Sequence, residues 1–345
     1  RGLAFCGLVG YNKPRPTFHW QEQGMKPDLS IIIVSFNTRQ LLRECLDSIY
    51  ASLAESTLAS EVIVVDNASH DGSAAMVQEN FPQVRLIANE ENRGFAAANN
   101  QALRAIGYGT GDTPHPSLPK YVMLLNPDTI VGEGALTTLV RFMDENPRAG
   151  ACGARLLHSD GSFQHSAFAF PTLFQVFLDF FPINYRLTNS RVNGRYPRRL
   201  YQTGKPFSID HPLGAALIVR REAIEQVGLL DERFFIYCEE IDWCLRIKAA
   251  GWSIWCVPEA QIVHYVARST GQFRDETFVA LWRSRYQLFG KHYSRFFQWM
   301  ARRIVGLGLW SEVRRARAAA RRGKITESEL ASRLTAYRQV WEMSA

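Results

Sequence analysis

The sequence lacks any apolar run of the roughly 18–20 residues that a membrane-spanning helix needs. Apolar runs such as Ile31–Val34 and Val62–Val65 are only as long as strands. Cysteine is also scarce, with six residues in 345 and no C-x-x-C pair, which excludes a disulfide scaffold. We therefore expect no transmembrane helix, and mostly buried, reduced thiols as in a cytoplasmic protein.

Glycine-rich turns are missing where many nucleotide-binding folds carry them. The first expected strand is followed by Ser35-Phe36-Asn37-Thr38, which has none of the glycines of a dinucleotide fingerprint. This disfavours nicotinamide and flavin enzymes, and also a nucleotidyltransferase, which would carry a glycine-rich loop at the same place. The motifs G-x-x-x-x-G-K-[ST] and G-x-S-x-G are absent too, which disfavours a P-loop enzyme and an α/β-hydrolase.

What is present is a globular composition with a regular alternation of elements. Hydrophobic residues make up 46% and charged residues 21%, and the length predicts about two domains. From Leu29 onward, short apolar strands alternate with amphipathic helices, which predicts an α/β fold with a doubly wound, mostly parallel sheet. We expect strands at 31–34, 62–65, 84–87 and 121–125, and helices at 40–50, after Asp71 and at 95–106. Residues 1–24 are expected to be a leader or extension, and 107–120 a surface loop.

Ligands of such sheets bind at the carboxyl ends of the strands, so the polar residues that follow each strand are the candidates. Asp66 directly follows the second expected strand and can accept the N3–H of a uracil or thymine base, whereas Asp71 and Ser73 are expected to cap the next helix. Further along, Asn92-Arg93-Gly94 opens a helix. There the backbone can approach a ligand closely, and Arg93 can bind a base or phosphate.

Two more acidic segments are candidates for metal binding and catalysis. Asp128, in Asn126-Pro127-Asp128, suits a divalent cation shared with substrate phosphates, although Asp-Thr after Pro is also a common turn. In the later run Glu239-Glu240-Ile241-Asp242, Asp242 is expected to pair with Arg246 one helical turn on. Glu239 and Glu240 have no such local partner, so either could serve as a general base. His264 ends an apolar strand and is either packed or a ligand.

In this order, these motifs resemble those of glycosyltransferase family 2, the inverting GT-A enzymes that use nucleotide sugars. The resemblance covers about Leu29 to Thr270, and it is strongest to rhamnosyltransferases of lipid-linked glycans. It implies Mg²⁺ or Mn²⁺ on Asp128, with His264 as a further contact of the metal or of the diphosphate. It also implies a base at Glu240, with Glu239 as its competitor. Arg268, Ser269 and Arg283 are candidates for further contacts to the diphosphate. The implied nucleotide-sugar site comprises Ser35, Asn37, Asp66, Asn67, Arg93, Gly94, Asn126 and Asp128.

The sequence departs from the family pattern at two positions. Asn126 replaces the first acid of the usual Asp-x-Asp motif, which lowers the negative charge available to a metal. Glu240 replaces the usual Asp at the base position and is one methylene longer, which leaves Glu239 as an alternative. The implied donor is dTDP-rhamnose, and a UDP-linked hexose or N-acetylhexosamine is the alternative. The implied acceptor is a hydroxyl of a glycan or of a polyprenyl-diphosphate-linked glycan.

The basic charge gathers at the C-terminal end. From Leu281 onward there are 14 Lys and Arg against 4 Asp and Glu, whereas residues 1–280 hold 26 against 29. We therefore expect a GT-A domain at 25–270, with its donor half at about 25–130 and its acceptor half at about 131–270. A basic helical region follows at 271–345.

Two parts of the chain could contact a membrane or pack against the protein. On the expected tail helix, Phe296, Phe297, Met300, Ile304 and Leu307 fall on one side, as in a helix at a membrane interface or a packed one. The aromatic segment 163–199 is expected to be core, with an acceptor-binding or membrane-facing role as the alternative. We expect a peripheral protein on the inner face of the membrane and no nucleic-acid partner. The rival from another class is a non-enzymatic membrane-binding module.

Overall fold

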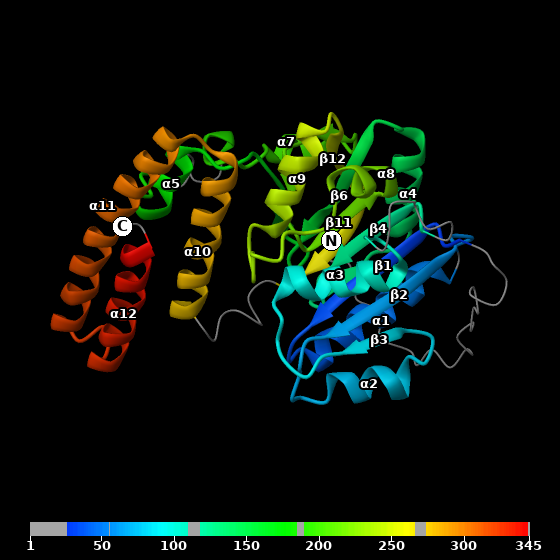
Figure 1. The fold of residues 1–345 in the computed structure, drawn as a ribbon, viewed down its shortest axis with the longest axis horizontal. Coiled ribbons are helices and arrows are strands. Elements are labelled where there is room, and N and C mark those ends of the chain that lie inside the picture. Colours follow the sequence, from blue (N-terminus) through cyan, green and yellow to red (C-terminus); the bar gives the residue numbers. More distant parts are fainter. Residues whose placement is uncertain (1–25, 55, 110–117, 185–189, 266–273, 344–345) are drawn as a thin grey trace, which may run out of the picture.

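The structure is a computed structural model that describes residues 26–54, 56–109, 118–184, 190–265 and 274–343. The expected leader 1–24, Cys6, the centre of the loop at 107–120, Arg268 and Ser269 lie outside these residues. A large sheet and its covering helices form one part of the molecule, and a group of helices made mostly from the C-terminal region forms the other (Figure 1).

The sheet has the strand order β3-β2-β1-β4-β11-β6-β12-β5. Strands β1 to β4 pair in parallel, as expected for a doubly wound fold. β11 runs antiparallel to both β4 and β6, β12 is parallel to β6, and β5 is antiparallel to β12. The strands are β1 (Leu29–Ser35), β2 (Ser60–Asp66), β3 (Arg85–Ala88), β4 (Tyr121–Leu125), β5 (Thr129–Val131), β6 (Ala149–Leu157), β11 (Ala216–Arg220) and β12 (Ser253–His264).

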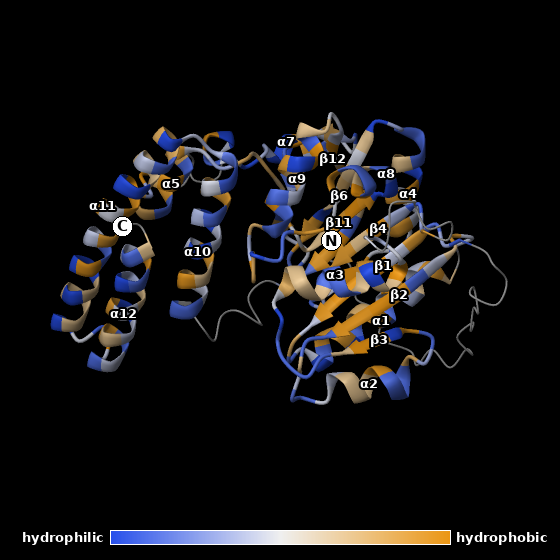
Figure 2. Ribbon diagram, in the orientation of Figure 1, coloured by the Kyte–Doolittle hydropathy of each residue, from blue (hydrophilic) through white to orange (hydrophobic). Residues whose placement is uncertain are grey.

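Helices cover both faces of the sheet, and alternation along the strands explains why. In β1, Ile31 and Ile33 face one core while Ile32 and Val34 face the other, because successive strand residues point to opposite faces. The first face is covered by α1 (Arg39–Leu53), α2 (Ser73–Asn80) and α4 (Ala135–Glu145). The second is covered by α3 (Phe95–Ile106), α8 (Arg221–Val227) and α9 (Glu239–Ala249). Orange strands between bluer helix surfaces show this pattern in Figure 2.

In the N-terminal half, the helices and strands lie close to the positions that the sequence predicts. The helix expected at 95–106 and the strand expected at 121–125 have those bounds, and the helix expected at 40–50 extends over Arg39–Leu53. The antiparallel strands β5 and β11 were not predicted. Between the main elements lie β7 (Phe163–Gln164), β8 (Ala167–Phe168), η2 (Arg191–Asn193), α7 (Arg198–Gln202), β9 (Phe207–Ser208) and β10 (His211–Pro212).

The C-terminal helices form a third core together with part of the aromatic segment. Helix α5 (Leu173–Phe180) leaves the sheet region and packs against α11 (Arg295–Arg321) and α10 (Arg274–His292) (Figure 1). Helix α12 (Glu327–Met343) packs against α10 and α11. Phe180 and Trp282 stack at 5.2 Å between ring centroids within this core. The interpretation of the aromatic segment as core is therefore confirmed for Phe180 on α5, whereas Phe174 on the same helix is exposed.

Two further expectations concern membrane helices and thiols. None of the helices in the described ranges combines the length and the apolarity that crossing a membrane requires. The five described cysteines are free and buried, as the sequence predicts, and they are Cys45, Cys152, Cys238, Cys244 and Cys256.

Candidate active site

The carboxyl ends of β1, β2 and β4 bring the sequence-predicted residues to one edge of the sheet. Ser35 and Asp66 are register partners at the ends of β1 and β2. The backbone N–H of Asn67 donates to the carbonyl of Ser35 at 2.8 Å. Asn126, just after β4, donates its N–H to the carbonyl of Ala215 at 2.9 Å, which joins this edge to the loop before β11.

Asp66 has the features of a ligand-binding carboxylate. Its side chain is 3% exposed, and its Oδ2 accepts the backbone N–H of Ser69 at 3.0 Å. Its Oδ1 is buried without a hydrogen-bond partner among the described residues. Because a buried acceptor without a partner is costly, this oxygen is poised to accept a donor such as a base N–H.

Asn67 holds the neighbouring loop in place. Its Nδ2 donates to Asn92 Oδ1 at 2.7 Å and to the Gly94 carbonyl at 3.3 Å, and its Oδ1 accepts from Asn89 Nδ2 and the Arg93 N–H at 3.1 and 3.0 Å. The full hydrogen-bonding capacity of this 2% exposed amide is therefore used within the protein. Asn67 thus shapes the site, while the half-exposed side chain of Arg93 extends from the loop it holds.

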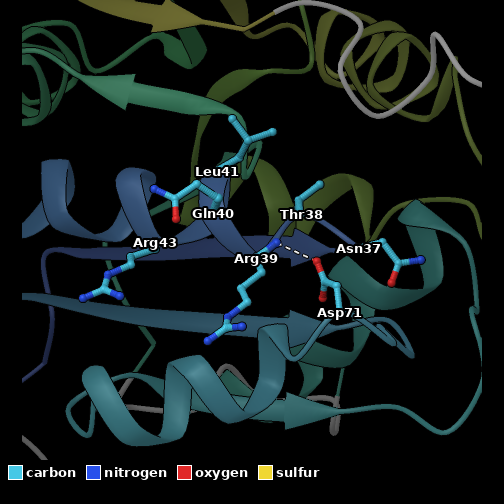
Figure 3. A pocket seen from close by; sticks show the side chains of 7 residues that line it. All are labelled: Asn37, Thr38, Arg39, Gln40, Leu41, Arg43 and Asp71. Carbon is cyan, nitrogen blue, oxygen red and sulfur yellow. Dashed lines mark hydrogen bonds between the residues drawn. The ribbon is translucent and has the colours of Figure 1, made fainter.

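The loop after β1 borders an open cavity of about 510 Å³ at the start of α1 (Figure 3). Asn37 lines it, and its Oδ1 accepts the N–H of His70 at 2.8 Å. Asp71 accepts the N–H of Arg39 at 2.8 Å and that of Ser73 at 3.0 Å, which are the first backbone N–H groups of α1 and α2. The N-cap of α2 is Gly72, so the cap expected at Asp71 or Ser73 is at neither residue. The hydroxyl of Ser35 is fully buried against that of Thr38, at 2.9 Å, so Ser35 supports this loop from beneath.

Gly94 brings the donor-side loop against the loop that precedes α9. Its φ is +82°, and a Cβ at this position would lie 2.5 Å from the carbonyl oxygen of Phe235. The next residue, Phe95, donates its N–H to that same oxygen at 2.6 Å. Only glycine fits this approach, which links the Asn92–Gly94 loop to the segment that carries the two glutamates.

Asp128 and His264 are far apart in the sequence and meet at the edge where β5 pairs with β12. His264 is the register partner of Thr129, and Tyr265 donates its N–H to the Asp128 carbonyl at 2.9 Å. His264 Nε2 lies 3.4 Å from Asp128 Oδ1, with both side chains nearly buried. The pairing brings together a carboxylate oxygen and an imidazole nitrogen, which are atoms of the kinds that bind divalent metals.

A third residue, Gln164, contacts the His264 ring. This contact was not predicted from the sequence. The side-chain nitrogen of Gln164 lies 3.1 Å from His264 Nδ1, and its Oε1 is buried without a partner among the described residues. Rotation of this amide exchanges the two atoms, so that Oε1 accepts an Nδ1–H and the Nε2 lone pair is free for a metal. Gln164 lies two residues into a short strand that no pattern in the sequence marks.

The donor set fits a metal that is shared with a substrate. No cluster of three or more His, Cys, Asp or Glu arranged for a metal exists among the described residues. Mg²⁺ typically takes one or two protein carboxylates and completes its shell with phosphate oxygens and water. Two converging ligands therefore fit an ion bound together with a diphosphate.

Glu239 and Glu240 begin α9, and each has a buried carboxylate oxygen without a hydrogen-bond partner among the described residues. Burial raises the pKa of Glu240 to about 6. Burial, with the neighbouring charge of Glu240, raises the pKa of Glu239 well above its usual value. Gly214 leaves room for Glu240, because a Cβ there would lie 3.3 Å from Glu240 Cγ. A carboxylate with a pKa near 6 is ionised at neutral pH and basic enough to accept a proton.

Backbone strain gathers in the loops of this site. Among the described residues, the non-glycine residues with positive φ are Asn37, Ala68, Tyr237 and Cys238. Asn37 follows β1, Ala68 follows β2, and the other two immediately precede Glu239. Such strain persists only where surrounding contacts enforce it, and it is concentrated at functional sites.

The pairing of Asp242 with Arg246 is confirmed at 2.9 Å, and the structure adds two further partners from α10, Lys291 and His292. Arg283 also lies on α10, where it is exposed.

A second cavity, of about 220 Å³, lies between α5, α9 and α10 beside Ile241. Its lining includes Phe168, Arg195, His211, Arg285 and Phe289.

Sequence comparison places the chain among known proteins. The pattern of the family Glycosyl transferase family 2 matches residues 30–228. An N-acetylglucosaminyl-diphospho-decaprenol L-rhamnosyltransferase from Mycobacterium tuberculosis is 32% identical over 286 residues, which is 79% of this chain and 91% of the relative. Rhamnosyltransferase WbbL from Escherichia coli K12 is 26% identical over 187 residues, which is 54% of this chain and 66% of the relative.

Structure comparison agrees on the fold. A mannosyltransferase from Pyrobaculum calidifontis, solved with GDP-Man and Mn²⁺, has a TM-score of 0.53 at 19% identity, covering 93% of this chain and 84% of the other. GalNAc-T7 with UDP, GalNAc and Mn²⁺ has a TM-score of 0.51 at 14% identity, covering 70% and 43%. The α/β architecture with its mixed, mostly parallel sheet is therefore the GT-A fold. The chain belongs to glycosyl transferase family 2 and is a glycosyltransferase.

Proposed function

We propose that the chain transfers a sugar, with inversion, from a nucleotide sugar to a hydroxyl of a glycan or of a polyprenyl-diphosphate-linked glycan. Three groups support this proposal: Asp66, whose Oδ1 has no partner among the described residues, the Asp128–His264 pair, and the two glutamates of α9. Contacts link their loops, because Asn126 bonds to Ala215, Gly214 lies against Glu240, and Phe95 bonds to Phe235. dTDP-rhamnose is the first donor to test because the similar M. tuberculosis and E. coli proteins are rhamnosyltransferases. A UDP-linked hexose or N-acetylhexosamine is the alternative donor.

The donor is held by the strand-end loops. Asp66 Oδ1 accepts the N3–H that uracil and thymine share, and the exposed Arg93 fork contacts the base or a phosphate. Asn37 and Asn126 line the nucleotide site, while Ser35, Asn67 and Gly94 hold its loops. Asp128 and His264 would hold Mg²⁺ or Mn²⁺, which, when bound, stabilises negative charge on the diphosphate. Arg268, Ser269 and Arg283 are proposed as further diphosphate contacts.

Glu240 acts on the acceptor. Its carboxylate removes the proton of the acceptor hydroxyl as that oxygen forms a bond to the anomeric carbon. The bond from the anomeric carbon to the diphosphate oxygen breaks on the opposite face, and the nucleoside diphosphate leaves with the electron pair. The anomeric configuration therefore inverts.

The proposal is tested by a donor screen. We expect the true nucleotide sugar with Mn²⁺ to raise the melting temperature, because a ligand that binds only the folded state stabilises it by about 2.7 kcal/mol at 100 times its Kd. The selected donor is then incubated with a polyprenyl-diphosphate-linked N-acetylglucosamine, and the anomeric configuration of the product is read by NMR. A product with retained configuration, or the absence of stabilisation by any dTDP- or UDP-sugar, contradicts the proposal.

We further propose that α11 contacts the inner membrane surface, where a lipid-linked acceptor would lie. Only part of the apolar side that the sequence predicts for this helix is exposed. Phe297 and Ile304 pack into the core that the C-terminal helices form with α5. The exposed face instead carries Phe296 (67%), Trp299, Leu307 and Trp310. Arg303 lies over the Trp299 ring at 5.5 Å and Arg314 over Trp310 at 4.7 Å.

The charge of this face favours an anionic lipid surface over a second copy of the chain. Helix α11 has seven arginines and one acid, Glu312, and no Asp or Glu is at an exposed position on it. A symmetric contact between two copies would place these arginines against each other, whereas anionic lipids neutralise them. Tryptophan is also the residue type most suited to the interface between headgroups and acyl chains.

Replacing Arg303 and Arg314 together by Gln is expected to weaken binding to phosphatidylglycerol vesicles by about 30-fold, since each basic residue at such a surface contributes about 1 kcal/mol. Trp299→Ala with Trp310→Ala should weaken it as well. Vesicle co-sedimentation measures both effects, with Phe36→Ala as the control, because Phe36 is an exposed aromatic on the sheet body. Unchanged binding of both double variants contradicts a role for this face.

A further inference from the structure

Helix α10 contacts the segments on both sides of the turn that precedes the two glutamates. Tyr237 and Cys238 are consecutive non-glycine residues in the left-handed region, with φ values of 68° and 67°. Each such residue costs roughly 1–2 kcal/mol, so this turn requires contacts that hold it. It lies between Ile236 and Glu239, and its shape sets where the carboxylates of α9 begin.

Helix α10 contacts the chain on both sides of this turn. Before it, the buried hydroxyl of Ser284 donates to the carbonyl of Ile236 at 2.6 Å. After it, His292 Nε2 and Lys291 Nζ both lie 2.6 Å from Asp242 Oδ1, and the Asp242 side chain is fully buried. Asp242 is two residues beyond Glu240 on α9, so the two sides of the turn are held by one helix.

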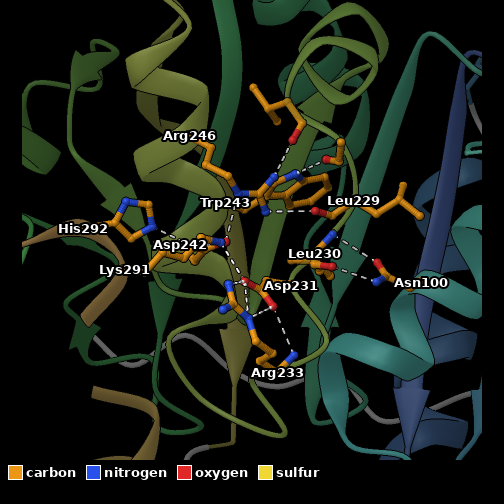
Figure 4. Close-up of polar contacts among 12 residues, drawn as sticks. Asn100, Leu229, Leu230, Asp231, Arg233, Asp242, Trp243, Arg246, Lys291 and His292 are labelled. Atoms are coloured by element: carbon orange, nitrogen blue, oxygen red, sulfur yellow. Dashed lines mark hydrogen bonds and ion pairs between the residues drawn. The ribbon is translucent and has the colours of Figure 1, made fainter. Parts of the chain in front are cut away.

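The remaining contacts fix α9 to the segment before it (Figure 4). The Arg246 guanidinium donates to Asp242 Oδ2 at 2.9 Å. It also donates to the carbonyl of Val227 at 2.6 Å and to that of Leu229 at 2.9 Å. Lys291 also contacts Asp231 Oδ2 at 2.7 Å. Helices α10 and α9 and the segment 227–231 therefore meet at Asp242. Because its carboxylate is buried, the loss of any one of these partners would destabilise this junction.

We propose that Ser284 and His292 are positioning residues, through which α10 holds the Tyr237–Cys238 turn and aims the carboxylates of Glu239 and Glu240 at the acceptor. This inference rests on the proposed sugar transfer for its catalytic consequence. Helix α10 lies beyond residues 30–228, the part that the family pattern matches. The C-terminal helices are then part of the catalytic apparatus as well as of the proposed membrane contact.

The test compares Ser284→Ala/His292→Ala with the wild type. Asp242 keeps Arg246 and Lys291 in this variant, so its charge stays paired and the protein is expected to fold. We expect faster hydrogen–deuterium exchange in peptides covering residues 234–241. We also expect kcat to fall by about 10- to 100-fold with donor KM unchanged, because a small displacement of a catalytic group has such effects.

Two control variants make the result specific. Ser332→Ala removes another hydroxyl that contacts α10, at Asp275 Oδ2, and should change neither exchange at 234–241 nor kcat. The second control compares two single variants in which Ser284 is unchanged. His292→Gln keeps an N–H donor near the position of Nε2, so it should recover most of the kcat that is lost in His292→Ala.

The exchange measurement separates this inference from the proposed function. If exchange at 234–241 is unchanged in the folded double variant, the inference is overturned whatever the activity. If exchange rises but kcat stays within about twofold of the wild type, the positioning role is overturned. If the wild type transfers no sugar, the proposed function fails, while faster exchange in the double variant still supports the hold of α10 on the turn.

Discussion

The Glu240→Gln variant is expected to transfer sugar about 10²–10⁴ times more slowly than the wild type, which is the usual cost of losing a well-placed general base. Glutamine keeps the size of the side chain and its place beside Gly214, but it cannot accept the acceptor proton. The donor site is formed by other loops, so the affinity for dTDP or UDP, measured by calorimetry, should not change. Single-turnover transfer measures the chemical step directly.

The pH dependence of the rate identifies which glutamate is the base. Burial raises the pKa of Glu240 to about 6, and a base must be ionised, so the wild-type rate should fall as the pH decreases through about 6. This acidic limb of the pH–rate profile should disappear in Glu240→Gln. Burial, with the neighbouring charge of Glu240, raises the pKa of Glu239 well above its usual value. Gln is the neutral isostere of both glutamates.

Glu239→Gln is therefore the matched comparison for Glu240→Gln. We expect it to lose less than about tenfold in rate and to keep the acidic limb of the profile. The reverse ranking, with Glu239→Gln inactive and Glu240→Gln near normal, would assign the base to Glu239. Equal and small losses in both variants would contradict a carboxylate base at this turn.

Much of this site could be predicted from the sequence because its residues follow strands. Asp66, Asp128 and His264 each stand at or just after an apolar run, and parallel strands bring their carboxyl ends to a common edge. Local periodicity also sufficed for the pairing of Asp242 with Arg246, since residues four apart face each other on a helix.

The contacts that no pattern marked are the long-range ones. Gln164 reaches His264, and His292 reaches Asp242, through packing of segments whose sequences carry no shared signal. Gly214 is conspicuous only once Glu240 is placed beside it. Such partners depend on the tertiary arrangement, which hydrophobic periodicity does not specify.

The face of α11 shows a different limit. Phe296 and Leu307 stand next to Phe297 and Ile304 around the helix, so the sequence shows one broad apolar side. Packing with α5 and α12 uses only part of it, and the exposed Trp299 and Trp310 continue the remainder. Periodicity therefore predicted an amphipathic helix but could not separate the packed stripe from the exposed one.

Asp128→Asn is expected to abolish the increase in nucleotide affinity that Mn²⁺ produces and to lower sugar transfer by at least about 10²-fold, since charge stabilisation by a metal supplies several kcal/mol. Asp128 is the sole carboxylate of the Asn126-Pro127-Asp128 motif, and within the described part of the chain its side chain pairs with His264. The amide keeps the shape of the residue but removes the charge that a hard cation needs. Calorimetric titration of dTDP and UDP, with and without Mn²⁺, measures the effect.

Glu259→Gln is the matched control, because Glu259 is an exposed acid on the same strand as His264 and pairs only loosely with Arg141, at 3.9 Å. It should leave the metal-linked affinity unchanged. His264→Ala should weaken that affinity in the same direction as Asp128→Asn, whereas nucleotide binding without metal should persist in both, because Asp66 and Arg93 lie on other loops. If Mn²⁺ still tightens nucleotide binding in Asp128→Asn as it does in the wild type, the ion is held elsewhere.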